Sequence, residues 1–179
     1  MTVKFTCDKH LHKCNKKCDI EFSDKLNIVS LYGREKKGKT STLCRLIDTM
    51  YQKSDQFKCL ASMTKKSNAL DKTFIFEFIS TGERIGVTTT GDTCYCLAKE
   101  FHWMRANNGK DCDLYICASH INGSTVNWLQ ARTTSGYLLR LSKLAVEHSK
   151  GVPIRTVFDE NVINQKQAEH LYDVVLSLL

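Results

Sequence analysis

The chain has 179 residues, of which 42% are hydrophobic and 25% charged, with a net charge of +7. This length allows one domain with a substantial core but not two full domains. The ordinary composition excludes a low-complexity, repetitive or largely disordered chain.

The first half of the chain predicts a strand, a loop, a helix and a hairpin. Residues 26–32 form an apolar run that suits a buried strand. Thr73–Ile79 and Arg84–Thr90 are rich in β-branched and aromatic residues, and the glycine between them suits a tight reversal. Between the first strand and this hairpin, apolar residues recur at helical spacing: Leu43, Leu46, Ile47 and Met50.

The middle of the chain predicts a helix and a further strand. Leu97, Phe101 and Met104 share one helical face, and Asn108-Gly109 offers a helix end. Asp113–Ser119 then reads as a buried strand. The order of elements is therefore strand, helix, hairpin, helix, strand.

The last third predicts mainly helix. Thr125–Glu147 has apolar residues at helical spacing with a break near Ser135-Gly136, so it is either one kinked helix or two short ones. Val152–Phe158 reads as a short strand. The final helix is expected to begin with Asn164 as its N-cap, before an apolar face: Ala168, Leu171, Val174, Val175 and Leu178.

Alternating strands and helices predict an α/β fold. We expect a three-layer α/β/α sandwich whose central sheet is mostly parallel and carries one antiparallel hairpin. Residues 26–179 form this domain, and residues 1–25 form a basic arm or an edge strand. In such a sheet, a ligand belongs at the carboxyl ends of the strands, beside the loop after the first strand.

That loop reads GREKKGKT and matches the pattern G-x-x-x-x-G-K-[ST]. Glycines allow consecutive backbone N–H groups to face a phosphate, and a following helix N-terminus favours negative charge. The alternative is a lysine-rich surface turn, but a predicted strand before the loop and a predicted helix after it favour phosphate. The predicted binding residues are Gly33, Arg34, Glu35, Lys36, Lys37, Gly38, Lys39, Thr40 and Ser41.

With this loop between a strand and a helix, the chain resembles the P-loop NTPase superfamily. The resemblance covers residues 26–178 in order of elements, and only the loop is specific in sequence. It implies a nucleoside triphosphate with Mg²⁺, and hydrolysis or phosphoryl transfer. Lys39 would bind the terminal phosphates, and the Thr40 hydroxyl would ligate the metal.

The resemblance also implies a carboxylate at the end of an apolar strand, holding the metal. Asp92 follows a strand-like run and a glycine and fits this role; together with Lys39 it is the predicted catalytic pair. The alternative is that Asp92 caps the next helix. The hairpin and the turn TTTGDT also look loosely like a small-GTPase switch region, but no N-K-x-D motif follows a strand, which favours ATP over GTP.

Other polar residues are weaker candidates. The turn Ser119–Thr125 carries His120, Asn122, Ser124 and Thr125, which could orient a water or a second substrate or could simply cap the next helix. Arg132 and Arg140 could form an arginine-bearing lid or a solvated helix face. Arg34 is an equally plausible phosphate contact.

The N-terminal segment CDKHLHKCNKKC offers zinc ligands, of which Cys7, His10, Cys14 and Cys18 are the candidate set, with His12 as a fifth. The spacing differs from paired C-x₂-C knuckles, and the alternatives are an edge strand or a basic arm that contacts nucleic acid. Residues 1–39 carry ten Lys or Arg against five Asp or Glu, so this end either contacts a nucleic acid or a protein partner or forms a solvated face.

These observations favour an Mg²⁺-dependent NTPase. A kinase that transfers the γ-phosphate and a nucleotide-dependent switch or interaction module are the alternatives. No apolar N-terminal run or long apolar span is present, so a cytoplasmic protein without membrane contact is expected. Cys44, Cys59 and Cys117 lie in apolar runs, which predicts buried thiols. The oligomeric state has no signature in the sequence.

Overall fold

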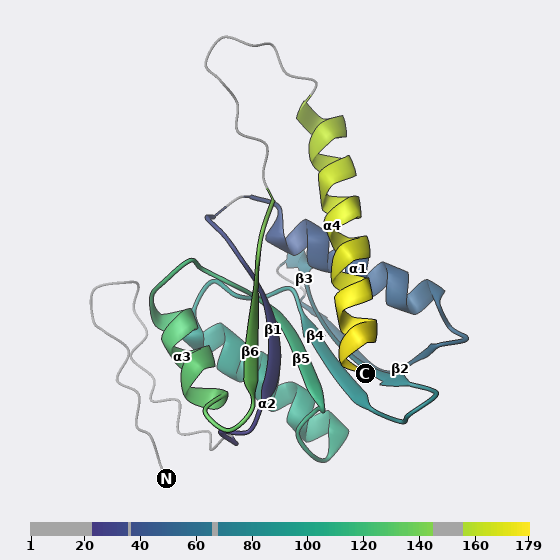
Figure 1. Ribbon diagram of the computed structural model, residues 1–179, viewed down its shortest axis with the longest axis vertical. Coiled ribbons are helices and arrows are strands. Elements are labelled where there is room, and N and C mark those ends of the chain that lie inside the picture. The colour runs from purple at the N-terminus through teal and green to yellow at the C-terminus, as the bar shows by residue number, and fades with distance from the viewer. Residues whose placement is uncertain (1–22, 36, 66–67, 145–155) are drawn as a thin grey trace.

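The computed structural model describes residues 23–35, 37–65, 68–144 and 156–179, except for the side chains of 156–159. These residues form four helices and a six-stranded mixed sheet (Figure 1). None of the described helices is long and apolar enough to span a bilayer. The elements are β1 (Asn27–Tyr32), α1 (Lys39–Gln52), β2 (Phe57–Lys65), β3 (Asn68–Phe78), β4 (Arg84–Thr88), α2 (Cys94–Asn108), β5 (Leu114–Ser119), α3 (Ser124–Arg132), β6 (Tyr137–Ser142) and α4 (Thr156–Leu178).

The sheet has the strand order β2-β3-β4-β5-β1-β6. Strands β4, β5, β1 and β6 are parallel to one another, whereas β2–β3 and β3–β4 are antiparallel. The predicted hairpin is confirmed as β3 and β4, with Thr73 opposite Thr88. β2 was not predicted, and it adds a second antiparallel pair. Because β5 lies between β4 and β1, the turn after β4 and the loop after β1 are separated by one strand.

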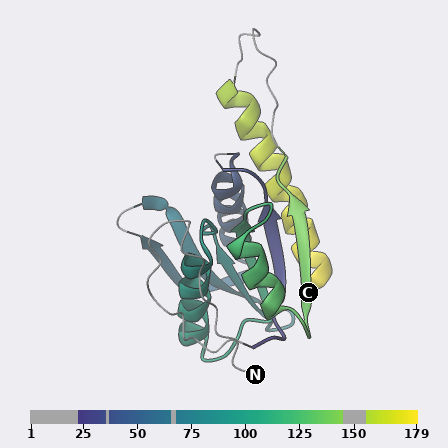
Figure 2. The same ribbon diagram turned by 90° about the vertical axis from the view of Figure 1, so that its left-hand side faces the viewer.

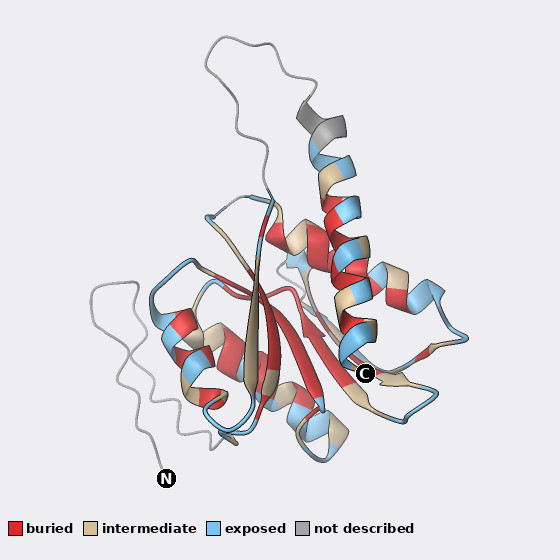
Figure 3. Cartoon of the chain, in the orientation of Figure 1, coloured by how far each residue is buried: buried red, intermediate tan, exposed pale blue. Residues whose placement is uncertain are grey.

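Helices cover both faces of the sheet, as a three-layer sandwich requires (Figure 2). On one face α1 and α4 pack against the sheet around Leu46, Phe76 and Leu171. On the other face α2 and α3 enclose a core that includes Phe101 and Trp128. The central strands are therefore buried on both sides, as Figure 3 shows. This double coverage explains why β1 and β5 read as continuous apolar runs in the sequence.

Two parts of the last third differ from the prediction. The stretch Thr125–Glu147 is neither a kinked helix nor two helices, because α3 ends at Arg132 and β6 follows as a strand paired with β1. The predicted strand Val152–Phe158 is wrong over Thr156–Phe158, where α4 has already begun; residues 152–155 lie outside the described residues.

Asn164 is not an N-cap, because α4 begins eight residues earlier. It lies inside the helix, where its side chain is buried against α1 and accepts a hydrogen bond from the Thr42 hydroxyl (3.3 Å). A polar residue before an amphipathic run is typical of a helix start, but here the polar side chain of Asn164 forms a hydrogen bond between two helices. The apolar face predicted for this helix is confirmed at Ala168, Leu171 and Val175.

The predicted buried thiols are confirmed for Cys44 and Cys117, and Cys59 is half-buried. Burial raises the pKa of Cys117 to about 12. A thiol so protonated is inert as a nucleophile at neutral pH, so Cys117 acts as a small core residue.

Candidate functional site

The loop that joins β1 to α1 lies at the carboxyl ends of the parallel strands. The Gly33 amide donates to the Ser119 carbonyl (3.3 Å), which fastens the start of the loop to the end of β5. At the end of the loop Gly38 has a φ of 79°, a left-handed conformation that glycine adopts without strain. The predicted context of the loop, between a buried strand and a helix, is confirmed.

The N-terminus of α1 suits an anion. The N-cap is Gly38, which has no side chain to cap the helix, and the first turn of this 14-residue helix contains no acidic residue. The first N–H groups of a helix have no intrahelical acceptor, and the helix dipole makes that end electropositive. Both features favour a bound anion over a bound cation at this helix end.

Lys39 is buried and bends back over the loop. Its Nζ donates to the Gly33 carbonyl (2.9 Å) and to the Arg34 carbonyl (2.8 Å), and the side chain is only 8% exposed. Burial lowers the pKa of Lys39, and the charges of Asp92 and Glu35 act against this shift. The ammonium is thus held at the mouth of the loop, within electrostatic reach of Asp92.

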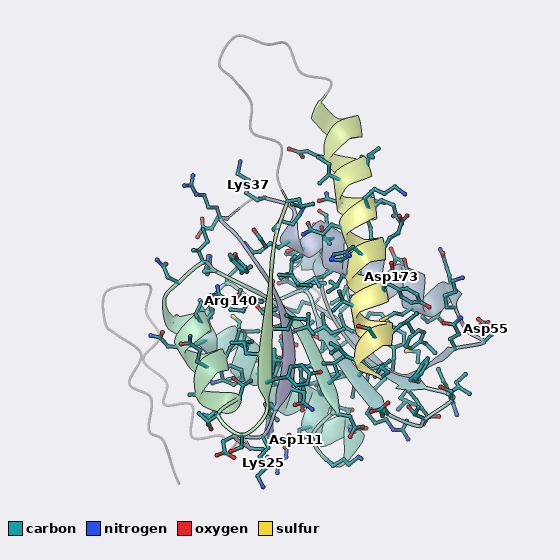
Figure 4. All side chains as sticks on the ribbon, viewed as in Figure 1. Lys25, Lys37, Asp55, Asp111, Arg140 and Asp173 are labelled. Carbon is teal, nitrogen blue, oxygen red and sulfur yellow. The ribbon has the colours of Figure 1, made fainter. Side chains whose placement is uncertain are left out.

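The other predicted loop residues are more open. Arg34, Glu35 and Lys37 are exposed, and Figure 4 shows Lys37 at the outer side of the loop. Thr40 and Ser41, in the first turn of α1, are half-buried. Lys36 lies outside the described residues.

Asp92 follows β4 at the same edge of the sheet. The cap of α2 is Thr93, whose hydroxyl accepts a hydrogen bond from the Cys96 amide (3.1 Å), so the reading of Asp92 as the helix cap is wrong. Gly91 packs so closely on β5 that a Cβ there would lie 2.2 Å from the Ala118 carbonyl oxygen. The close packing of Gly91 therefore fixes the position of the backbone at Asp92. The carboxylate of Asp92 is exposed and available for other contacts.

His120 directly follows β5, the strand that lies between β1 with its loop and β4 with the Asp92 turn. Its Nε2 is 3.1 Å from the Asp92 carbonyl oxygen, a hydrogen bond in the tautomer that protonates Nε2. Its backbone amide donates to the Thr125 hydroxyl (3.3 Å). The Thr125 hydroxyl thus ties the turn to α3 without capping it, since the N-cap of α3 is Gly123 and makes no side-chain cap hydrogen bond, while His120 itself reaches the turn that carries Asp92.

The two arginines of the predicted lid serve as anchors. Arg140 lies on β6, where its guanidinium stacks over Tyr32 at 4.4 Å and donates to the carbonyls of His120 (3.0 Å) and Ile121 (2.9 Å). Arg132 ends α3 and lies over the ring of Trp128. Figure 4 shows Arg140 within the body of the molecule. Both residues hold secondary structure in place, so a lid between them is wrong.

The sequence does not single out Lys143, because the leucine spacing of the strand before it also fits a helix. Lys143 directly follows β6, and its amide donates to the Tyr32 carbonyl (2.7 Å) at the last residue before the loop. Its side chain is 7% exposed. The signal that could have found it is the segment YLLRLS after the Ser-Gly turn: read as a strand beside β1, it places the next lysine at the edge with the loop.

A separate hollow lies at the opposite end of the sheet, between Lys25, Glu83, Asp111, Asp113 and Tyr137. Figure 4 shows Lys25 and Asp111 at the far end of the molecule from Lys37. Three carboxylates in this lining disfavour a polyanion. The loop edge is therefore the better anion site.

Metal ligands are sparse in the described part of the chain. Residues 23–35, 37–65, 68–144 and 156–179 contain no group of three or more His, Cys, Asp or Glu side chains able to hold a metal. The zinc candidates Cys7, His10, Cys14 and Cys18, with His12, lie outside these residues. The prediction of zinc therefore stays a prediction.

Comparison with known proteins returned no likeness. No family model, no curated protein and no solved structure matches the chain. What this chain binds has to be inferred from the residues that gather where β1, β4, β5 and β6 end.

Proposed function

We propose that the chain binds a nucleoside triphosphate with Mg²⁺ at residues 33–41 and hydrolyses it. The observation that carries this proposal is the position of Lys39. A buried ammonium, held by two carbonyls of the loop, lies at the start of a helix whose N-cap is a glycine and offers no capping side chain. A cation, a helix N-terminus and a glycine-bounded loop are the three parts of a phosphate cradle.

In this proposal the loop binds the phosphates and Lys39 neutralises them. Backbone N–H groups between Gly33 and Gly38 face the phosphate oxygens, and the helix dipole adds positive potential. The two carbonyls that hold Lys39 limit its rotamer freedom, so little entropy is lost when it also contacts a phosphate. This preorganisation supports a site built for an anion.

Thr40 and Asp92 fit a magnesium ion. Mg²⁺ prefers oxygen ligands and is usually held by one or two protein groups together with waters and phosphate oxygens. A hydroxyl at the start of α1 and one exposed carboxylate after β4 are such a donor set, and the charge of Asp92 acts on Lys39. When bound, the ion would neutralise charge that develops on the phosphates.

Hydrolysis also requires that a water be oriented toward the terminal phosphate. Two side chains at the Asp92 end can do this: the Asp92 carboxylate and the His120 ring, which is held at the Asp92 carbonyl. Lys39 would stabilise the charge on the transferred group. We propose Lys39 and Asp92 as the catalytic pair, with His120 as the candidate that positions the water.

ATP is favoured over GTP. The turn after β5 reads HINGST, which lacks an N-K-x-D guanine-reading motif. A thermal-shift panel of ATP, GTP, their diphosphates and their deoxy forms, with Mg²⁺ and with EDTA, tests this choice, because a ligand that binds only the folded state raises the melting temperature. A larger shift with GTP than with ATP would reverse the preference.

Product analysis separates hydrolysis from the alternatives. Free phosphate released without an added acceptor supports an NTPase, and a product that forms only with an acceptor supports a kinase. Binding without turnover until nucleic acid or a partner protein is added supports a switch. The matched controls are Lys39→Met, which should abolish the activity, and Lys53→Met at the exposed C-terminal end of α1, which should not.

A further inference from the structure

Two buried lysines flank the first glycine of the loop. A Cβ on Gly33 would lie 3.0 Å from the Cβ of Lys143 and 3.9 Å from the Cδ of Lys39. One lysine comes from the start of α1 and the other from the end of β6, more than a hundred residues later. The sequence motif explains only Lys39.

Lys143 is buried without a carboxylate partner in the described part of the chain. Its Nζ donates to the carbonyl of Leu144, the next residue, and no Asp or Glu of residues 23–35, 37–65, 68–144 or 160–179 forms a salt bridge with it. Burial lowers the pKa of Lys143 to about 8, and the charge of Glu160 on α4 partly opposes that shift. A buried ammonium with one acceptor is unfavourable unless an anion joins it.

Gln167 on α4 fixes the backbone on both sides of Lys143. Its Nε2 donates to the Ser142 carbonyl (2.6 Å), and its Oε1 accepts from the Leu144 amide (3.1 Å). The Lys143 amide itself is held by Tyr32. Three consecutive residues are therefore fixed by hydrogen bonds, which is the kind of support that a binding residue needs and a solvated lysine does not.

The sheet order places Lys143 on the opposite side of the loop strand from Asp92. β6 adjoins β1 on one side, and β5 and then β4 lie on the other. A triphosphate laid over the loop with its metal-bound end toward Asp92 therefore has its nucleoside end toward Lys143. The phosphate at that end is the one linked to the ribose.

We propose that Lys143 binds the nucleoside-proximal phosphate of the nucleotide, as a second cation beside Lys39. This inference rests on the proposed function. It assigns Lys39 and Lys143 to opposite ends of the phosphate chain, so a diphosphate keeps the Lys143 contact while it loses part of the metal end. The contact requires the protonated ammonium, so binding should weaken as Lys143 loses its proton.

The test is isothermal titration calorimetry of ATP, ADP and inorganic tripolyphosphate, with Mg²⁺, into wild type, Lys143→Met, Lys39→Met and the control Lys53→Met. Lys143→Met should weaken all three ligands by about tenfold or more, since a charge-assisted hydrogen bond is lost. Its melting temperature should not fall, because an apolar side chain of similar length replaces a buried charge.

A pH series separates binding from a structural role. Wild-type affinity should fall by about tenfold between about pH 7 and about pH 9, as Lys143 deprotonates in the empty site. Other charged groups at or near the loop are Arg34, Glu35, Lys37, Lys39, Asp92 and Glu160, and all of them remain in Lys143→Met. The variant should therefore show a smaller fall than wild type.

Each outcome decides the proposal. Equal affinity of wild type and Lys143→Met overturns the inference, and if Lys39→Met still loses binding, the proposed function stands. A loss with ATP and ADP but not with tripolyphosphate would assign Lys143 to the nucleoside and not to a phosphate. If wild type binds no nucleotide, the proposed function and this inference both fall.

Discussion

The Thr42 hydroxyl on α1 donates to the side-chain oxygen of Asn164 on α4, and the same oxygen lies against Gly38 at the end of the loop. A Cβ on Gly38 would lie 2.7 Å from that oxygen. Helix α4 therefore also limits the space available to the loop at Gly38. Gly38 is constrained twice, by its positive φ and by Asn164.

The first prediction concerns this double constraint. Gly38→Ala should lower the free energy of unfolding by about 2–3 kcal/mol, because left-handed strain adds to overpacking. Gly109→Ala is the matched control: Gly109 also has a positive φ, but nothing lies within 4 Å of its Cβ position. It should cost only about 1 kcal/mol.

Urea denaturation of both variants measures the difference. In an Asn164→Ala background the obstructing side chain is absent. Gly38→Ala should therefore lower the free energy of unfolding by less in this background than in the wild-type protein. Equal costs at Gly38 and Gly109 would show that Asn164 does not restrict the loop.

The second prediction separates Asp92 from Thr93. Thr93→Ala removes the cap of α2 and should cost about 1 kcal/mol of stability while Mg²⁺-dependent hydrolysis persists. Asp92→Ala should leave the melting temperature nearly unchanged and should abolish the Mg²⁺-dependent hydrolysis. The opposite pattern would make Asp92 the structural residue and would remove it from the metal site.

The third prediction concerns an ion pair between the buried Glu100 and the half-buried Lys65. Glu100 is fully buried; its carboxylate accepts from the Thr73 hydroxyl (2.8 Å) and pairs with Lys65 (3.0 Å), which also reaches the Thr90 hydroxyl. Lys65→Met removes the partner of Glu100 and leaves its buried charge uncompensated. The substitution should lower the free energy of unfolding by about 2–3 kcal/mol.

Lys58→Met, on an exposed site of the same strand, is the control for Lys65→Met and should be nearly neutral. The double variant Lys65→Met/Glu100→Leu should recover most of the loss, since both charges are then gone. A double variant as unstable as Lys65→Met would mean that packing, and not charge, explains the effect.

The fourth prediction concerns pH and the stability of the empty protein. The pKa of Lys143 is about 8 in the folded state and near its ordinary 10.5 in the unfolded chain, so between these values the unfolded state binds the additional proton. Charged Lys143 therefore destabilises the fold below pH 8, and this penalty disappears as the pH rises toward 10.5.

Lys143→Met should accordingly be more stable than wild type at neutral pH, and its advantage should shrink through that window. Denaturant titrations of both proteins across the alkaline range measure the difference in their free energies of unfolding. Thiols and phenols also titrate in this range, but they are the same in both proteins, so their contributions cancel in the difference. A constant difference would mean that Lys143 is not buried as a charge.

The parts of the site that could be predicted from the sequence are contiguous. The loop, its strand and its helix lie within residues 26–52, and local periodicity together with two glycines and a lysine suffices to recognise them. Asp92 could be found because a short strand precedes it. Its rival role as a cap could not be decided, because Asp92 and Thr93 are both good capping residues and only the geometry selects Thr93.

Lys143 and Asn164 could not be predicted because their roles depend on contacts distant in sequence. β6 has leucines at 138, 139 and 141, a spacing that a helix also allows, and only its pairing with β1 makes it a strand. Asn164 looks like a cap until α1 is placed beside it. β2 could not be predicted for a related reason: it is an edge strand that alternates exposed with half-buried residues and pairs with β3 alone among the described strands.

The central claim is that Lys39 and the loop at the start of α1 grip a triphosphate. Its most direct test is calorimetric titration of ATP with Mg²⁺ into wild type and Lys39→Met at constant ionic strength, with circular dichroism to confirm that both are folded. We expect saturable one-to-one binding by wild type and a loss of at least about tenfold in Lys39→Met. Binding of equal affinity by the two proteins, or none by wild type, would contradict the proposal.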